Sequence, residues 1–340
     1  MKQSKVLDEA NDIENIIENF NLHDKNDYSK VGDLIINKKI KYIVTIARGS
    51  SDSVALFTSY LFAKTLGIPT YSLPPSVITL EKSKFDFSNS IVIIISQSGL
   101  SEDLKVCSEE CRKMGAYLLL ITNNSNSPII KNSHFFFDMK AKKEESIAAT
   151  KTYIMSLLNV IKLVAKTSNQ ETILKYLYQL PQYIQREKKE EWDPEIIDKT
   201  ITKGYVISRG LGFALSTEIA FKFKELSLEL IEPFSTAEVM HGPKTLIDQS
   251  LKLFILSLGD VSGKSVNNNI KSFRIMSDKI YSINHLDDTK SNFKFNSANL
   301  PEIDSILLMS KFYPMIIKYS ILKGIDPDKP RYLSKVTNTL

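Results

Sequence analysis

The sequence predicts an α/β protein with two tandem duplicated domains, each a doubly wound parallel sheet with helices on both faces. Short apolar runs alternate with segments of helical spacing, and the runs are apolar throughout, as in strands covered on both faces. Two landmarks then recur at one spacing. Arg48-Gly49 and Arg209-Gly210, each after an apolar run, lie 161 residues apart, and so do Ser96 and Ser257. We therefore expect a duplication without an insertion between the landmarks.

In the first half, the predicted strands are the apolar runs and the predicted helices are the stretches between them. Residues 91–95 are five β-branched side chains in a row, which favours a buried strand. The other strands are predicted at 42–46, 70–73, 116–122 and 135–138. Apolar residues at helical spacing predict helices at 5–20, 54–66, 102–114 and 148–166. ARGSSDS, residues 47–53, is predicted to be the turn after the first strand.

The second half is expected to repeat this plan. KGYVIS and LKLFILS are apolar runs that end at Ser208 and Ser257, and residues 304–323 predict a long helix. Pro181 and Pro194 are expected to break a charged linker. The predicted parts are an N-terminal helical arm at 1–30, a first domain at 31–167, a helical linker at 168–199, a second domain at 200–325 and a C-terminal tail at 326–340.

Composition and charge exclude several classes of protein. The 340 residues are 43% hydrophobic, enough to bury real cores, and the net charge of +5 is scattered along the chain. Nucleic acid is therefore not an expected partner, and residues 1–40 are too short and acidic for a helix-turn-helix. No apolar run approaches the roughly 18 residues that span a membrane, and no signal segment is visible, so we expect a soluble cytoplasmic protein.

The two cysteines, Cys107 and Cys111, lie four residues apart in a predicted helix. A disulfide within one helical turn has poor geometry, and two thiols without a nearby histidine make a weak metal site. We expect buried or half-buried free thiols and no metal site. His23, His134 and His285 have no partner motif and are expected to be structural.

Hydroxyl side chains cluster directly after two of the predicted strands. They are Ser50, Ser51 and Ser53 after the first strand, and Ser96, Ser98 and Ser101 after the strand at 91–95. Ligands of open parallel sheets bind outside the carboxyl ends of the strands, and a helix N-terminus there favours an anion. Neither G-x-x-x-x-G-K-[ST] nor G-x-G-x-x-G is present, so a monophosphate fits better than a nucleotide. The alternative is that each serine merely caps a helix.

Five segments resemble the successive signatures of the sugar isomerase (SIS) family: ARGSSDS, SQSGLSEDL, SIAATKTY, FKFKELSLELIEPFSTAEVMHGP and DPDKPRYLSK. The resemblance spans residues 5–340 and implies tandem duplicated SIS domains. The pattern is similar to the double-SIS isomerase module of glucosamine-6-phosphate synthase, and ARGSS and SIAATK are closer to the free-standing SIS-type glucosamine-6-phosphate deaminases. The synthase's glutaminase domain and terminal cysteine have no counterpart in this sequence, so we expect no glutamine hydrolysis by this chain.

The resemblance implies three catalytic residues. Glu225 would shuttle a proton between C1 and C2 of the sugar, with Lys222 on the same helical face. His241, oriented by Glu238, would open the sugar ring in the neighbouring subunit's site, which implies a homodimer with shared active sites. Lys335 would form an imine with the open-chain ketose. From the residues alone, the alternatives are a surface ion pair, a structural histidine and a solvated tail lysine.

The resemblance also implies the substrate contacts, but no cofactor and no metal. The residues expected to hold the phosphate are Ser51, Ser96, Gln97, Ser98 and Ser101. Those expected to line the sugar or bind the substrate elsewhere are Ser50, Ile147, Ala149, Lys222 and Ser334.

This sequence departs from the synthase pattern at two places, and its second domain differs from its first. Leu100 stands where the synthase usually has an acidic residue. Ala149 replaces a serine, which favours the deaminase branch. SLGDVSG, at residues 257–263, is the second domain's counterpart of the serine cluster and keeps only Ser257 and Gly259. We therefore expect no second phosphate site.

These expectations favour an enzyme that releases ammonia from glucosamine 6-phosphate to give fructose 6-phosphate, or runs the reverse reaction. Its partner would be a small-molecule hexose phosphate, and no membrane is expected. One alternative is another aminosugar- or ketose-phosphate isomerase or deglycase, or an aminotransferase-like isomerase without the glutaminase. Another is a sugar-phosphate sensor without catalysis. The joint presence of Glu225, His241 and Lys335 favours catalysis.

Overall fold

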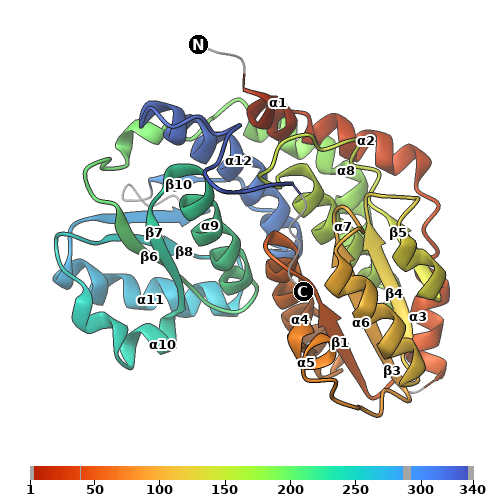
Figure 1. Ribbon diagram of the computed structural model, residues 1–340. Helices are drawn as coiled ribbons and strands as arrows, with labels where there is room; N and C mark the ends of the chain where they lie inside the picture. Colours follow the sequence, from red (N-terminus) through yellow and green to blue (C-terminus); the bar gives the residue numbers. More distant parts are fainter. Residues whose placement is uncertain (1–3, 39, 286–291, 336–340) are drawn as a thin grey trace. The chain divides into compact units, whose positions relative to one another are not determined.

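The computed structural model describes residues 4–38, 40–285 and 292–335 (Figure 1). Contacts divide the chain into two compact units, each with one five-stranded sheet. The β1–β5 unit comprises Asn15–Glu145, Ala149–Gln179 and Tyr332–Leu340. The β6–β10 unit comprises Met1–Glu14, Ser146–Ala148 and Leu180–Arg331.

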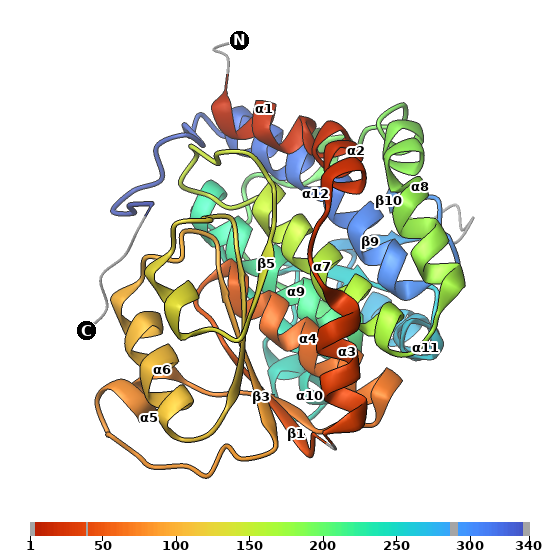
Figure 2. The ribbon, with the colours of Figure 1, turned by 90° about the vertical axis from the view of Figure 1, so that its right-hand side faces the viewer.

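The sheet of the β1–β5 unit is parallel throughout, with the strand order β2-β1-β3-β4-β5. Its strands are β1 (Tyr42–Ile46), β2 (Thr70–Ser72), β3 (Ser90–Ser96), β4 (Tyr117–Thr122) and β5 (Phe135–Asp138). Its helices are α3 (Tyr28–Asn37), α4 (Ser50–Leu66), α5 (Pro75–Thr79), α6 (Glu102–Lys113), α7 (Lys151–Thr167) and the 3₁₀ helix η1 (Pro128–Asn132). Helices α5 and α6 cover one face, and α3, α4 and α7 cover the other (Figure 2). The predicted doubly wound sheet is confirmed.

β3 is the central strand, and all seven of its residues are buried. Val92 and Ile94 pack with Cys107 and Cys111 of α6 in one apolar cluster. Both thiols are free and buried, as expected, and burial raises the pKa of Cys107 to about 12. These cysteines are therefore core residues that stay protonated at neutral pH.

The helix after β1 begins earlier than predicted. α4 starts at Ser50, so the prediction of a turn through Ser53 is wrong. Its N-cap is Gly49 with φ 58°, a left-handed conformation that glycine adopts at little cost. Because the chain turns at this one residue, Ser50, Ser51 and Ser53 lie in the first turn of the helix.

The sheet of the β6–β10 unit has the equivalent order, β7-β6-β8-β9-β10, and is also parallel. Its strands are β6 (Lys203–Ser208), β7 (Leu230–Ser235), β8 (Lys252–Leu256), β9 (Ile280–Asn284) and β10 (Phe293–Lys294). Its helices are α1 (Lys5–Asn11), α9 (Leu211–Ser227), α10 (Thr236–Met240), α11 (Val261–Met276), α12 (Pro301–Leu322) and the 3₁₀ helices η2 (Pro194–Ile196) and η3 (Pro243–Leu246). Gly210, before α9, has φ 62° and repeats the turn at Gly49. The predicted duplication is confirmed.

α12 is the core helix of the β6–β10 unit. Of the described helices, it alone is long and apolar enough to cross a membrane, and 72% of that apolar window is buried inside the protein. α1 and α9 pack against it. After α12, Asp328 accepts hydrogen bonds from the N–H groups of Lys5 (3.0 Å) and Val6 (2.8 Å) and so caps α1.

The predicted N-terminal helix at 5–20 is two helices, because α1 ends at its C-cap Asp12 and α2 (Ile13–His23) follows. The predicted break at Pro181 is wrong, since α8 (Glu171–Glu187) runs through this proline. Proline leaves the carbonyl groups one turn earlier without their usual donor. Asn21 donates from Nδ2 to the carbonyl of Tyr178 at 3.1 Å and lies 3.5 Å from the carbonyl of Leu177, the one that Pro181 leaves without a donor.

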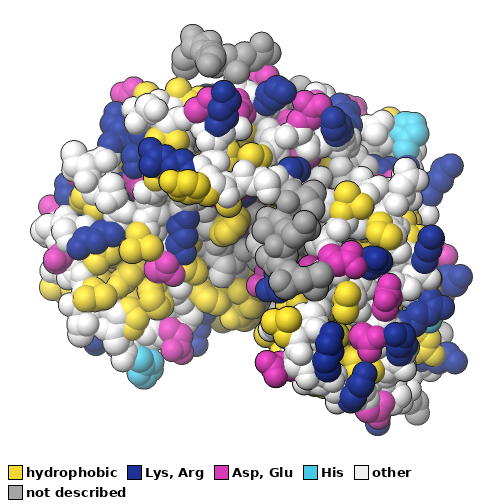
Figure 3. Space-filling view, viewed as in Figure 1, with side chains coloured by type: hydrophobic (Ala, Val, Ile, Leu, Met, Phe, Trp, Pro, Cys, Tyr) yellow, Lys and Arg dark blue, Asp and Glu magenta, His cyan; other side chains and the backbone are white. Residues whose placement is uncertain are grey.

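The surface carries mixed charge, as its composition predicts. On the face shown in Figure 3, basic and acidic side chains alternate over the described residues without a large block of one sign. Mixed charge of this kind is typical of a solvated protein surface.

A buried ionic cluster joins α12 to the sheet of the β6–β10 unit. Lys252 and Glu229 are fully buried, with Nζ 2.9 Å from Oε2. Lys323 reaches Oε1 of Glu229 at 2.6 Å, and the Tyr319 hydroxyl donates to the same atom at 2.7 Å. Burial lowers the pKa of Lys252, and the Glu229 carboxylate opposes that shift. Glu229 therefore compensates two ammonium groups at once.

Glu229→Gln is expected to lower the free energy of unfolding of the β6–β10 unit by about 3–5 kcal/mol, because buried ammonium groups lose their carboxylate. Trp192 is the single tryptophan and is 5% exposed in this unit, so its fluorescence in urea reports the unfolding. The matched control is Glu232→Gln in β7, which breaks an exposed pair with Lys224. It should cost less than about 1 kcal/mol. Equal losses in the two variants would contradict this account.

Candidate active site

The loop from β3 to α6, residues 97–101, lies at the carboxyl edge of the β1–β5 sheet. Ser96 Oγ accepts a hydrogen bond from the N–H of Gly99 at 3.1 Å, and Ser98 Oγ accepts one from the N–H of Leu100 at 3.2 Å. The Ser98 hydroxyl is the acceptor in this bond, so its hydrogen can still be donated to a ligand. Gln97 and Ser98 are half-buried and so open to a ligand.

Side chains of residues that follow β4 donate hydrogen bonds to the backbone of this loop. Asn124 donates to the carbonyl of Ser98 at 2.8 Å, and the Ser127 hydroxyl donates to the carbonyl of Gly99 at 2.7 Å. A side chain at position 99, where φ is 59°, would come within 2.5 Å of Ser127 Oγ, so glycine is required. Sequence reasoning missed these two supports. The signal was available in Asn123-Asn124, which directly follows a strand at the same edge.

Neither α4 nor α6 is capped by a hydrogen bond from a serine hydroxyl. The N-cap of α6 is Ser101, whose side chain makes no capping hydrogen bond. The N-cap of α4 is Gly49, which has no side chain. The capping alternative is therefore wrong for α4, whereas Ser101 occupies the N-cap position of α6 without making a capping bond. The N–H groups and the dipole at the N-terminus of each helix favour an anion.

An ion pair joins the two serine-bearing segments. Arg48 Nε lies 3.0 Å from Oδ2 of Asp103, whose side chain is 1% exposed. Arg48 precedes α4, and Asp103 lies in the first turn of α6. Burial raises the pKa of Asp52 in the first turn of α4, while the Ser72 hydrogen bond and the Arg48 charge oppose that shift. The pair fixes the spacing between the two helix N-termini.

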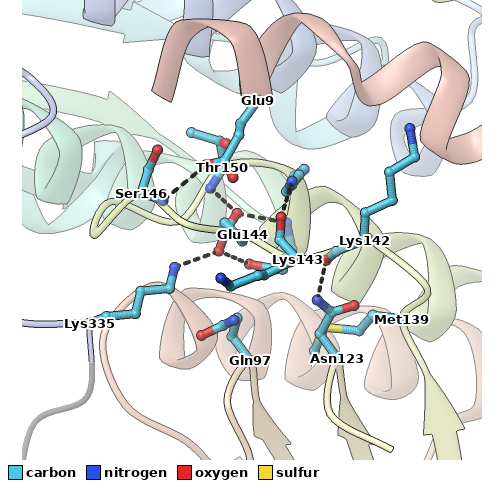
Figure 4. Close-up of polar contacts among 12 residues, drawn as sticks. Glu9, Gln97, Asn123, Met139, Lys142, Lys143, Glu144, Ser146, Thr150 and Lys335 are labelled. Atoms are coloured by element: carbon cyan, nitrogen blue, oxygen red, sulfur yellow. Dashed lines mark hydrogen bonds and ion pairs between the residues drawn. The ribbon is translucent and has the colours of Figure 1, made fainter. Parts of the chain in front are cut away.

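A cleft of about 580 Å³ opens on this edge of the β1–β5 unit. Its lining residues are Gln97, Ser98, Leu100, Asn123, Asn124, Asp138, Lys140, Lys142, Lys143, Glu144 and Lys335. The structure therefore brings the predicted phosphate loop and the predicted imine lysine into one cleft. Lys335 Nζ lies 2.9 Å from Oε2 of Glu144, and Figure 4 shows Gln97 beside this pair.

Glu144 also binds the start of α7. Its Oε1 accepts from the N–H groups of Thr150 at 3.0 Å and Thr152 at 3.2 Å, and Oε2 accepts from the Thr152 hydroxyl at 2.7 Å (Figure 4). Sequence reasoning missed Glu144, although it begins the segment that leads into SIAATK. The predicted sugar-lining residues Ile147 and Ala149 are half-buried, and Ala149 lies in the β1–β5 unit while Ile147 groups with the β6–β10 unit.

In the β6–β10 unit, Glu225 forms a buried ion pair on α9. Its Oε2 lies 2.6 Å from Nζ of Lys222, and the two side chains are 7% and 0% exposed. Lys222 also lies 3.5 Å from Glu218, which accepts a hydrogen bond from the Tyr313 hydroxyl at 2.8 Å. The alternative of a surface ion pair is therefore wrong. A carboxylate that is buried and whose orientation is fixed by an ion pair is suited to proton transfer.

His241 follows α10 and has an exposed side chain. In the part of the chain that the structure describes, no hydrogen bond or ion pair holds its ring. Its backbone N–H donates to the carbonyl of Glu238 at 3.0 Å, and the Glu238 side chain is exposed. The orientation of His241 by Glu238 and its contact with a second subunit stay predictions. Ser334 is exposed beside Lys335 in the tail.

The counterpart of the phosphate loop in the β6–β10 unit already binds a carboxylate. Asp304 accepts hydrogen bonds from the Ser297 hydroxyl at 2.6 Å and the Ala298 N–H at 2.7 Å, and also from the backbone of Gly259. Burial raises the pKa of Asp304 to about 6, against these hydrogen bonds. The Asp304 carboxylate thus already accepts the hydrogen bond that the backbone of Gly259 in this loop can donate.

The remaining histidines have structural contacts. His134 Nδ1 accepts from the N–H of Leu118 at 3.0 Å, and burial lowers the pKa of His134. His23 Nδ1 lies 3.0 Å from the Asn19 carbonyl, and the half-buried His285 packs against an aromatic ring. Across residues 4–38, 40–285 and 292–335, no three His, Cys, Asp or Glu side chains are placed to hold a metal ion together.

The sequence model of the SIS domain family matches residues 35–165, which contain the β1–β5 sheet and the loop at 97–101. Residues 35–165 are therefore a SIS domain, with which the observed fold and the order of the motifs agree. The match ends before the β6–β10 unit, whose equivalent sheet order shows the second copy of the fold.

Curated relatives support this assignment. The chain is 28% identical over 302 residues to a glutamine–fructose-6-phosphate aminotransferase (isomerizing) of Sulfolobus acidocaldarius, covering 86% of this chain and 49% of the relative. It is 25% identical over 355 residues to the protein of the same name from Escherichia coli K12, covering 98% of this chain and 58% of the relative. The chain thus spans about half the length of the curated relatives that it matches.

Solved structures show the same duplicated fold. A protein from Silicibacter pomeroyi DSS-3, described as a candidate phosphosugar isomerase, has a TM-score of 0.88 at 25% identity and covers 96% of this chain and 100% of that chain. A glucosamine-6-phosphate deaminase from Thermotoga maritima has a TM-score of 0.76 at 22% identity, covering 99% and 100%. The C-terminal domain of a glucosamine-fructose-6-phosphate aminotransferase from Francisella tularensis has a TM-score of 0.80 at 22% identity, covering 96% and 98%. The last two similarities show the fold alone.

Ser98→Ala is expected to weaken the binding of fructose 6-phosphate by about 1–2 kcal/mol, the scale of one hydrogen bond to a charged group. Calorimetric titration measures the loss. The control is Ser59→Ala, which removes a hydroxyl that bonds within α4, away from the cleft. It should leave the affinity unchanged. Equal affinity in wild type and Ser98→Ala would show that this hydroxyl does not hold the phosphate.

Proposed function

We propose that this chain interconverts glucosamine 6-phosphate and fructose 6-phosphate, with ammonia released in one direction and taken up in the other. One observation carries the proposal: a single cleft is lined by Ser98 and Lys335. A hydroxyl beside a helix N-terminus suits a phosphate, and an amine suits the carbonyl of an open-chain ketose. A ligand that carries both groups is a ketose phosphate.

The phosphate would be held by hydroxyls and backbone N–H groups without a tightly bound counter-ion. Ser51 lies in the first turn of α4, Ser101 is the N-cap of α6, and Ser98 lies in the loop before it. The pair of Arg48 and Asp103 joins these two helix starts. Helix N-termini supply partial positive charge to a phosphate at low desolvation cost. A preorganised loop of this kind binds the substrate's remote end and leaves the reacting carbons free to be positioned.

The proton transfer is assigned to Glu225. In the deaminating direction, it would take the proton from C2 of the open-chain amino sugar and return it to C1, which converts the 2-amino aldose into a 2-imino ketose. The Lys335 amine would then add to C2 and displace ammonia, and water would hydrolyse the lysine imine to fructose 6-phosphate. The buried Lys222 fixes the direction of the Glu225 carboxylate, which supports this role.

We assign ring opening to His241, acting in the site of a second subunit. An exposed imidazole at the end of a short helix is available to a partner chain, and imidazole is a common general acid and base. This assignment requires at least a homodimer.

A second candidate is an isomerase that makes glucosamine 6-phosphate with ammonia supplied by another chain. The names of the curated relatives favour it, because they describe aminotransferases of which this chain covers about half. The same residues would act in the reverse order. A silent sensor is less favoured, because a buried Glu225 paired with Lys222 would have no task in it.

In deuterated water, wild type given fructose 6-phosphate and ammonia is expected to form glucosamine 6-phosphate with deuterium on carbon. Glu225→Gln should lower turnover at least about a hundredfold, the usual scale for a general base, while still binding the sugar phosphate. Mass spectrometry and an ammonia assay measure both effects. Glu232→Gln, which affects an exposed pair, is the matched control and should keep its activity. Wild type that binds hexose phosphates without turnover or exchange would support the sensor instead.

The shared site can be tested by mixing two inactive variants, Glu225→Gln and His241→Ala. A heterodimer of the two has one site with both wild-type residues, so about half of the wild-type activity per heterodimer is expected. Tagged copies purified together allow activity to be measured on heterodimers alone. Inactive heterodimers would place both residues in the site of one chain.

A further inference from the structure

Glu144 connects two parts of the cleft that are distant in sequence. Its carboxylate, 0% exposed, accepts three hydrogen bonds from Thr150 and Thr152 at the start of α7. Its fourth partner is Lys335, 191 positions later. The three α7 donors are neutral, so Lys335 is the partner among these four that supplies an opposite charge. A buried carboxylate is costly without such compensation.

The tail depends on this contact for its place in the β1–β5 unit. Tyr332, Leu333 and Ser334 are exposed, and residues 332–335 form no helix or strand. Among residues 332–335, Lys335 is the one that is half-buried, with 26% of its side chain exposed. A charged contact such as this ion pair can position a segment that has little buried surface of its own.

A neighbouring ion pair, between Lys143 and Glu145, is exposed to solvent and serves as a comparison. Lys143 Nζ lies 3.2 Å from Oε1 of Glu145, and these side chains are 83% and 48% exposed. Exposed pairs of this kind contribute little to stability. Two neighbouring glutamates of this loop therefore differ, since Glu144 is buried in its ion pair and Glu145 is exposed in its pair, and Glu145 provides a control.

We propose that Glu144 is a positioning residue that seats the C-terminal tail by binding Lys335, and so places this amine beside the phosphate loop before a sugar arrives. The reaction of Lys335 with a ketose rests on the proposed function, whereas its seating by Glu144 does not. An amine adds to a carbonyl only as the neutral base, so Lys335 must give up a proton and leave Glu144 first. The same contact keeps the lysine unreactive in the ligand-free protein.

The rate at which acetic anhydride acylates each lysine of the ligand-free chain tests the proposal, with peptide mass spectrometry as readout. Glu144→Gln keeps the side-chain length and one acceptor oxygen for α7 but removes the charge. It should raise the acylation rate of Lys335 at least about fivefold, because the charge-assisted bond is lost. Glu145→Gln should change that rate by less than about twofold. Lys151, which donates to the Lys143 carbonyl at 2.7 Å in the first turn of α7, reports whether the helix stays intact.

A faster rate at Lys335 with an unchanged rate at Lys151 supports the proposal. An unchanged rate at Lys335 overturns it, and so does an equal rise at both lysines, which would make Glu144 a support of α7 alone. If Glu144→Gln does not fold, Lys335→Met is used, and amide hydrogen exchange in the tail should become faster than in wild type. Equally slow exchange there would overturn the proposal. No sugar is present, so these results stand even if the chain turns over no hexose phosphate.

Discussion

Parallel pairing of β3 with β1 on one side and β4 on the other is the constraint on which the candidate site depends. Parallel strands end at one edge, so segments far apart in sequence deliver their polar residues to the same place. The register sets Ser96 opposite Thr122, which brings Asn124 and Ser127 under the loop that starts at Ser96. The carbonyl groups of Ser98 and Gly99 thereby accept hydrogen bonds from the protein itself, and the Ser98 hydroxyl can still donate to a ligand. A site built in this way is rigid before any substrate binds, which lowers the entropy cost of binding.

The two copies of the fold have kept one architecture and acquired different chemistry. Both sheets have the same strand order, and both first helices start after a left-handed glycine. The loop after β3 keeps its hydroxyl groups, whereas the backbone of Gly259 after β8 is bonded to Asp304. In return, α9 of the second copy carries the buried pair of Lys222 and Glu225. The hydroxyl-bearing loop therefore lies in one unit and the buried ion pair of α9 in the other.

Strand positions were predictable from the sequence because burial on both faces leaves apolar runs, and β1 and β5 lie at the predicted residues. The start of α4 was not predictable, because the sequence does not distinguish a left-handed glycine before a helix, such as Gly49, from a glycine within a longer turn. The continuation of α8 through Pro181 was not predictable either, because the compensating donor, Asn21, is 157 positions from the carbonyl that it binds. The serines of the site were predictable from their place after strands. The contact between Glu144 and Lys335 was not, since a pairing across 191 positions leaves no local pattern.

The central claim proposed here is that the cleft of the β1–β5 unit holds a ketose phosphate with its carbonyl at Lys335. Reduction with borohydride in the presence of fructose 6-phosphate converts such an imine into a stable secondary amine, which peptide mass spectrometry assigns to one residue. The account predicts an adduct at Lys335 that excess inorganic phosphate suppresses, because both ligands need the same loop. An adduct at Lys140 or Lys142 of the same cleft with Lys335 unmodified, or no adduct at all, would contradict it.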